Sequence, residues 1–100
     1  MDIYYLKEHM FDELNGAKEY YKQASCLKKN NPAWSKQFYD MANMEMAHAK
    51  NLYNMFVEHY NEINTDPTLE KYMRPFEESV TDAFMDKMGA VKSMQEKYDK

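Results

Sequence analysis

Two Asx-Pro pairs divide this chain into three segments. Asn31 precedes Pro32, and Asp66 precedes Pro67. Asn and Asp are favoured N-cap residues, and proline is favoured at the first helical position because its missing N–H would have no partner there. The two pairs therefore predict the starts of a second and a third helix.

The segments between these boundaries contain little that interrupts a helix. Only two glycines and three prolines occur in 100 residues, whereas there are ten methionines, which favour helices. Pro75 lies away from a predicted helix start, and it removes a hydrogen bond and disfavours helical geometry at the preceding residue. We expect one domain, residues 1–100, with helices at 3–28 and 32–61 and a third helical segment at 67–98 broken near Pro75.

Each segment carries a stripe of residues spaced by threes and fours, which is typical of a bundle-forming helix. In the first segment the stripe is Leu6, Met10, Glu13, Ala17, Tyr20, Ala24 and Leu27. In the second it is Trp34, Phe38, Met41, Glu45, His48, Leu52 and Met55. In the third it is Phe76, Val80, Phe84, Met88, Val91 and Tyr98. Long helices with short connections predict an all-α fold, an antiparallel helical hairpin plus a third helix.

The supply of large apolar residues favours self-association. Fifteen aromatic residues and ten methionines exceed what the core of a lone three-helix unit needs. A surplus left on the surface favours a homodimer or a higher homo-oligomer.

Charge and hydropathy exclude two classes of partner. Thirteen Lys and Arg against seventeen Asp and Glu give a net charge of -4, so we expect no nucleic-acid partner, because neutralising phosphates needs a cationic excess. The longest apolar runs are far shorter than the roughly 20 residues that cross a bilayer. The first residues already show amphipathic spacing with interleaved charge, so we expect no signal peptide, no membrane partner and a cytoplasmic protein.

Three polar residues occupy positions in the stripes that are otherwise apolar: Glu13 in the first, and Glu45 with His48 in the second. A buried carboxylate requires a partner. Glu13 lies 18 residues before Asn31, near the turn, while Glu45 and His48 lie 14 and 17 residues after it. With a rise of about 1.5 Å per residue, an antiparallel hairpin places all three within one turn of one another.

Glu45 and His48 form a Glu-x-x-His motif, whose spacing puts a carboxylate and an imidazole on one helix face. Mixed ligands of this kind suit iron or manganese, with zinc as a competitor. The motif alone occurs often by chance, but its place in the stripe and the matching level of Glu13 strengthen it. The alternative is a hydrogen-bonded network of the same three residues that fixes the helix register.

Two stretches carry a resemblance to a known family: ELNGAKEYYKQA at 13–24 and FYDMANMEMAHAKNL at 38–52. They are similar to the first helix pair of the ferritin-like superfamily, and of its rubrerythrin type in particular. The matching positions are Glu13, Ala17, Tyr20, Ala24, Ala42, Glu45, His48 and Ala49. The resemblance extends over roughly residues 1–60.

The resemblance implies a di-iron carboxylate site with Glu13, Glu45 and His48 as ligands and with Tyr20 or Tyr39 next to them. Family members use such sites to oxidise ferrous iron with oxygen or peroxide, which would make this chain an oxidoreductase of the ferroxidase or peroxidase type. The chain departs from the family pattern because residues 67–100 contain no histidine. Only half of a site, one Glu and one Glu-x-x-His, is therefore encoded.

Two completions of this half site are open. In the first, the hairpins of a homodimer form a four-helix bundle, similar to encapsulated ferritins, whose short chains resemble half a ferritin bundle and build the iron site across a subunit interface. In the second, a carboxylate comes from the third segment, from Glu77, Glu78 or Asp82. We favour the dimer because Glu77 and Glu78 lie in the first turn after Pro75, where acidic residues commonly accompany the helix dipole.

A different class of function also fits the sequence. Short ferritin-like chains rich in Met and Tyr resemble proteins encoded by bacteriophages, so the alternative is a non-catalytic structural or assembly module, such as a virion-associated protein. A capsid or compartment shell would then be its partner. On either reading we expect His9 and His59 to be surface histidines.

Overall fold

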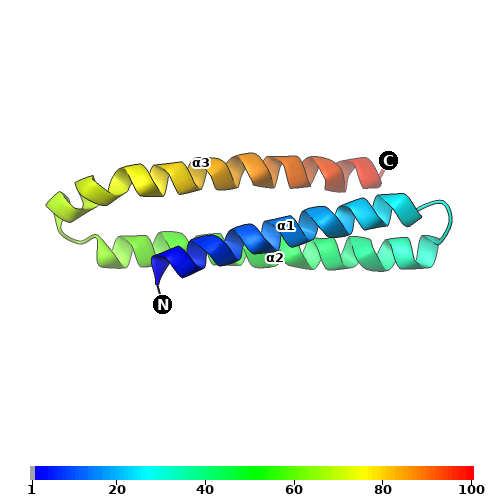
Figure 1. Cartoon of the computed structure of the whole chain (residues 1–100), viewed down its shortest axis with the longest axis horizontal. Helices are drawn as coiled ribbons and strands as arrows, with labels where there is room; N and C mark the ends of the chain where they lie inside the picture. Colours follow the sequence, from blue (N-terminus) through cyan, green and yellow to red (C-terminus); the bar gives the residue numbers. More distant parts are fainter. Residues whose placement is uncertain (1) are drawn as a thin grey trace.

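The computed structural model describes residues 2–100, which form three helices and no strand. Helix α1 spans Ile3–Leu27, α2 spans Pro32–Ile63 and α3 spans Pro67–Tyr98. The helices lie lengthwise beside one another, and the whole measures 57 × 21 × 14 Å (Figure 1). The all-α fold and the antiparallel hairpin of α1 and α2 are confirmed.

The predicted helix starts are present. The side chain of Asn31 accepts a hydrogen bond from the backbone N–H of Trp34 at 3.2 Å, with Pro32 as the first residue of α2. The side chain of Asp66 likewise accepts from the N–H of Thr68 at 2.8 Å, ahead of α3. Each cap satisfies one of the N–H groups that a helix start leaves without a partner.

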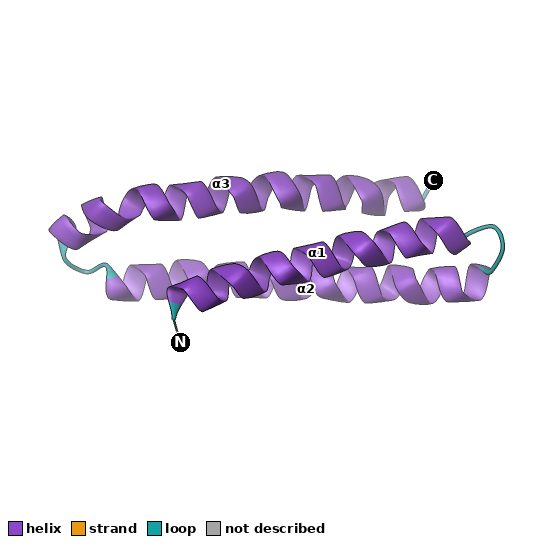
Figure 2. Cartoon of the chain, in the orientation of Figure 1, coloured by secondary structure: helices purple, strands orange, loops and turns teal. Residues whose placement is uncertain are grey.

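Helix α3 continues through Pro75, where we expected a break (Figure 2). The proline ring removes the hydrogen bond that would otherwise end on the carbonyl of Lys71. Because Lys71 and Pro75 are both exposed, water can reach that carbonyl and the helix tolerates the loss. The residues that follow then hold α3 on the hairpin.

Helix α3 packs mainly on α1 and less on α2. Its predicted stripe forms the contact, with Val80, Phe84, Met88 and Val91 all buried. The ring of Phe84 stacks on Tyr53 of α2 at 4.7 Å between centroids. Four of the six residues of the predicted α3 stripe are therefore buried, and Leu6, Met10, Ala17 and Ala24 of the predicted α1 stripe are buried as well.

The predicted stripe of α2 does not form the core. The buried residues of α2 are instead Ser35, Ala42, Met46, Ala49, Phe56 and Tyr60. Trp34, Met41 and Met55 are 59%, 39% and 45% exposed. Small side chains at Ser35, Ala42 and Ala49 let α1 approach α2 closely, and this close packing turns the larger residues of the stripe away from the core.

The exposed stripe gives the hairpin an uncovered side, which we call the open face. It carries Tyr5, His9, Trp34, Met41, His48 and Met55. The contacts of α3 with the hairpin use other residues, among them Phe11, Asn43 and Tyr53. The molecule thus has one side covered by α3 and one side where two long helices lie open.

Within residues 2–100, no helix has both the length and the apolar character needed to span a bilayer.

Candidate metal centre

The structure brings Glu13 of α1 together with Glu45 and His48 of α2. One ligand atom from each of the three side chains lies within 4.8 Å of the other two. Oε2 of Glu13 is 3.8 Å from Nδ1 of His48. The three residues therefore lie at the same level of the helix pair, as the count from Asn31 predicted.

A second imidazole, His9, lies next to this cluster. Its Nε2 is 3.5 Å from Oε1 of Glu13, so the Glu13 carboxylate has an imidazole near each of its oxygens. The His9 side chain is 41% exposed, which agrees with the expected surface position, but the expectation missed its contact with Glu13. The spacing of four residues between His9 and Glu13 was the available signal, since it puts both on one helix face.

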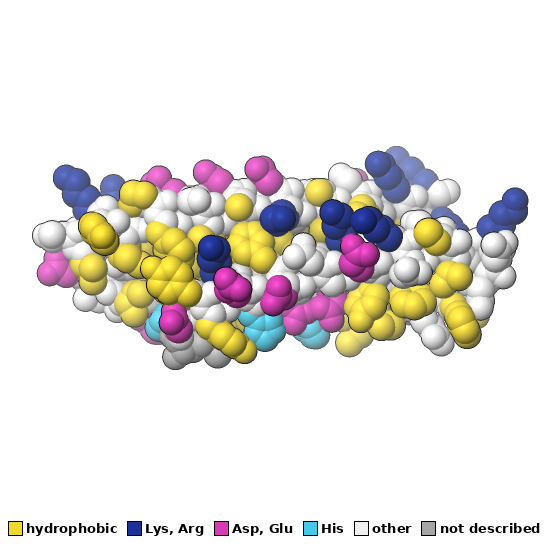
Figure 3. All heavy atoms as spheres, in the orientation of Figure 1, with side chains coloured by type: hydrophobic (Ala, Val, Ile, Leu, Met, Phe, Trp, Pro, Cys, Tyr) yellow, Lys and Arg dark blue, Asp and Glu magenta, His cyan; other side chains and the backbone are white. Residues whose placement is uncertain are grey.

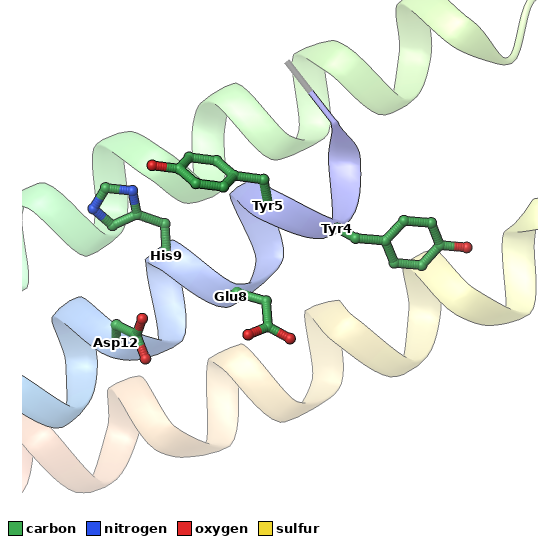
Figure 4. Close-up of a pocket in the computed structure, with 5 residues that line it drawn as sticks. All are labelled: Tyr4, Tyr5, Glu8, His9 and Asp12. Carbon is green, nitrogen blue, oxygen red and sulfur yellow. The ribbon is translucent and has the colours of Figure 1, made fainter.

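His9 also borders a shallow surface hollow of ≈ 490 Å³ lined by Tyr4, Tyr5, Glu8 and Asp12. Figure 4 shows the rings of Tyr5 and His9 side by side on one flank of α1, with Glu8 and Asp12 directed elsewhere. Among residues 2–100, Glu8, His9 and Asp12 do not form a second grouping with metal-binding geometry.

The pKa of the Glu45 carboxyl lies above the ordinary value for a glutamate. A hydrogen bond with the carboxyl of Glu13 raises the pKa of Glu45 to about 7, and partial burial and the negative charge of Glu13 act in the same direction. The imidazoles of His48 and His9 oppose the shift. A cation bound between the two carboxyls would compete with the proton on Glu45.

Room for the Glu45 carboxyl comes from a glycine on α1. A Cβ placed on Gly16 would lie 3.0 Å from Oε2 of Glu45. Gly16 is one turn beyond Glu13 on the same face of α1. The glutamate of α2 thus crosses the helix interface above a residue that has no side chain.

The cluster is accessible from the open face. The side chain of Glu13 is 18% exposed and that of His48 is 52% exposed. Figure 3 shows the histidine side chains along the edge of the molecule remote from α3, beside acidic and hydrophobic side chains. The cluster predicted on the inward faces of the two helices is therefore partly exposed to solvent on the open face.

The two tyrosines predicted to lie next to the ligands contact different neighbours. The ring of Tyr20 contacts that of Phe38, with 6.0 Å between centroids. Tyr39 stacks on Tyr98 and its hydroxyl donates to Asp99 at 3.0 Å, so it is engaged with the end of α3. The structure does not bring Tyr39 to the cluster, and a role for Tyr20 stays a prediction.

The carboxylates of α3 lie outside the cluster as well. Glu77 accepts a hydrogen bond from Thr81 at 3.0 Å, on the side where Thr81 contacts Tyr53. Glu78 and Asp82 are exposed. Among residues 2–100, the one grouping of His, Cys, Asp and Glu with metal-binding geometry is that of Glu13, Glu45 and His48, without a member from α3.

The donor set fits a transition-metal cation. Two carboxylates and one imidazole are the mixed oxygen and nitrogen ligands that suit iron or manganese. The Glu13 carboxyl raises the pKa of Glu45, which indicates that positive charge is favourable between the two side chains. Fold and cluster together define a helical carboxylate protein with a candidate metal centre between two antiparallel helices.

A family model described as rubrerythrin matches residues 5–98. The chain belongs to the rubrerythrin family. The match extends well beyond the first helix pair on which the sequence resemblance rested, and it includes α3. In the comparisons with curated proteins and with solved structures, no match was found.

Proposed function

We propose that two copies of this chain bind iron between their open faces and oxidise ferrous iron with oxygen or peroxide. The observation that carries the proposal is the cluster of Glu13, Glu45 and His48, in which the neighbouring Glu13 carboxyl raises the pKa of Glu45. Membership of the rubrerythrin family, whose members typically bind iron, supports iron over other cations.

The need for a second copy follows from the donor count. One chain offers three ligand atoms in the cluster, and α3 adds none within residues 2–100. Two copies related by a two-fold axis through the open face would supply four carboxylates and two imidazoles. That is the ligand number of a two-metal centre, in which the cations lie about 3.5–4 Å apart.

The apolar side chains around the cluster supply a surface for that association. Tyr5, Trp34, Met41 and Met55 are each 39% to 59% exposed and lie on the open face. Burial of exposed aromatic and methionine side chains drives association, and methionine adapts its shape to a partner. A symmetric contact across this face would place both clusters at its centre.

The chain's own residues have distinct tasks in this scheme. Glu13 and Glu45 would hold the cations and neutralise their charge, and Glu45 would release its proton as the cation binds. His48 would add one neutral nitrogen donor. Iron bound there supplies one electron per ion, so two ferrous ions and two protons convert one hydrogen peroxide into two waters.

Oxidation of stoichiometric ferrous iron under air tests the proposal. The wild-type protein should oxidise the iron faster than buffer does, and Glu45→Ala should be no faster than buffer. Glu96→Ala, at an exposed glutamate of α3 outside both the cluster and the open face, is the control and should behave as wild type.

Wild-type protein that oxidises iron no faster than buffer would contradict the catalytic proposal. If it also retains no metal, the three residues form a polar layer in a structural helical module. In that case Glu45→Ala would change stability or oligomeric state without any metal phenotype.

A further inference from the structure

Gly16 lies in the middle of a 25-residue helix, where glycine is unfavourable. It forms no turn and no cap, and its φ is not positive. The backbone of α1 therefore gives no reason for glycine at this position.

The reason lies on the neighbouring helix. The three atoms nearest to a Cβ on Gly16 all belong to Glu45: Oε2 at 3.0 Å, Cδ at 3.6 Å and Cγ at 3.7 Å. The closest of these contacts is tighter than ordinary van der Waals packing, so the carboxyl would have to move by a few tenths of an ångström to admit a methyl group. The space of the missing side chain is occupied by the carboxyl end of Glu45.

We propose that Gly16 is a positioning residue of the metal centre. Its missing side chain lets the Glu45 carboxyl extend across α1 far enough to meet the Glu13 carboxyl. A side chain at position 16 displaces Glu45 from Glu13 and separates two of the ligands. This inference rests on the proposed metal binding, because the positioning matters only if a cation is held there.

The second glycine of the chain provides a matched control. Gly89 is exposed and lies inside α3, and a Cβ placed on it meets nothing within 4 Å. Alanine at either position replaces a helical glycine with a better helix former. The two substitutions therefore share their local effect and differ only in the contact with Glu45.

The test compares thermal unfolding without metal and the affinity for Mn²⁺, measured by titration calorimetry, for wild type, Gly16→Ala and Gly89→Ala. Gly89→Ala should unfold at a higher temperature, by about 4 °C, because helix propensity improves, and Gly16→Ala should gain less because it displaces the Glu45 carboxyl. Gly16→Ala should bind Mn²⁺ about tenfold more weakly, as changes to residues that orient ligands do, while Gly89→Ala should bind as wild type.

A larger side chain sharpens the comparison. Gly16→Leu should remain helical by circular dichroism and lose Mn²⁺ binding, whereas Gly89→Leu should retain it. Wild-type affinity in both Gly16→Ala and Gly16→Leu would overturn the positioning role while leaving the metal site intact. Absence of Mn²⁺ and Fe²⁺ binding in the wild type would instead overturn the metal centre itself, and the positioning role with it.

Discussion

The carboxyl of Glu45 faces that of Glu13 across the interface of α1 and α2, with ligand atoms of the two within 4.8 Å of one another, and the Glu13 carboxyl together with partial burial raises the pKa of Glu45 to about 7. The ordinary value for a glutamate is 4.5. Between these two pH values the folded chain binds a proton at Glu45 that the unfolded chain releases. Stability and cation binding therefore both depend on pH, in opposite directions.

The metal-free protein should lose stability as the pH rises. The raised pKa of Glu45 contributes stability that is fully present below about pH 4.5, declines as the pH rises and is lost above about pH 7. Urea unfolding at pH 5, 6, 7 and 8 measures this dependence. Glu45→Gln cannot titrate, so the difference between wild type and variant isolates the contribution of Glu45. A difference that stays constant from pH 5 to pH 8 would contradict the raised pKa of Glu45.

Cation binding should show the opposite dependence. Because Glu45 must release its proton for a cation to bind, the affinity for Mn²⁺ should increase as the pH rises to about 7 and then level off. Titration calorimetry at several pH values, in buffers of different ionisation enthalpy, measures both the affinity and the proton released. Binding without proton release at pH 6 would count against Glu45 as a ligand.

Removal of His9 should weaken the metal centre. His9 lies 3.5 Å from the Glu13 carboxylate, and loss of a partner that orients a ligand typically lowers metal affinity by about 10-fold to 100-fold. His59 pairs with Glu62 at 3.7 Å on α2, away from the cluster, and is the matched control. We expect weaker Mn²⁺ binding in His9→Ala and unchanged binding in His59→Ala. An equal loss of Mn²⁺ affinity in both variants would contradict a specific role of His9 in orienting Glu13.

Phe84→Ala should release α3 from the hairpin. The Phe84 side chain is 2% exposed and packs between Phe11 and Tyr53, and loss of a buried phenylalanine costs about 3–5 kcal/mol. Met85, its neighbour on α3, is 50% exposed, so Met85→Ala should have little effect. Chemical denaturation followed by helical circular dichroism gives both values. A loss below about 1 kcal/mol for Phe84→Ala would contradict the docking of α3 through this stripe.

Helix identity and the level of the cluster could be predicted because both depend on local rules. Cap chemistry fixed the starts at Pro32 and Pro67, and the helical rise set Glu13 opposite Glu45 and His48. Both predictions depend only on the sequence of two consecutive helices and the turn that joins them.

The phase of α2 could not be predicted in the same way. Its sequence offers two stripes, one of large residues such as Trp34 and Met55 and one that includes the small residues Ala42 and Ala49. A prediction that expects the largest apolar residues to be buried favours the first stripe. The structure buries the second stripe, whose small residues let α1 lie close to α2. Contacts between residues distant in sequence could not be predicted either. The hydrogen bond from Tyr39 to Asp99, for example, depends on where α3 ends.

The central claim, a metal centre shared by two copies, is tested most directly by the iron content of each chain and the mass of the loaded assembly. Wild type and Glu45→Ala are loaded with ferrous iron without oxygen, desalted, and measured by elemental analysis and native mass spectrometry. We predict about one iron per chain in a wild-type dimer and none in Glu45→Ala. Iron held by a wild-type monomer, or no iron in either protein, would contradict the account.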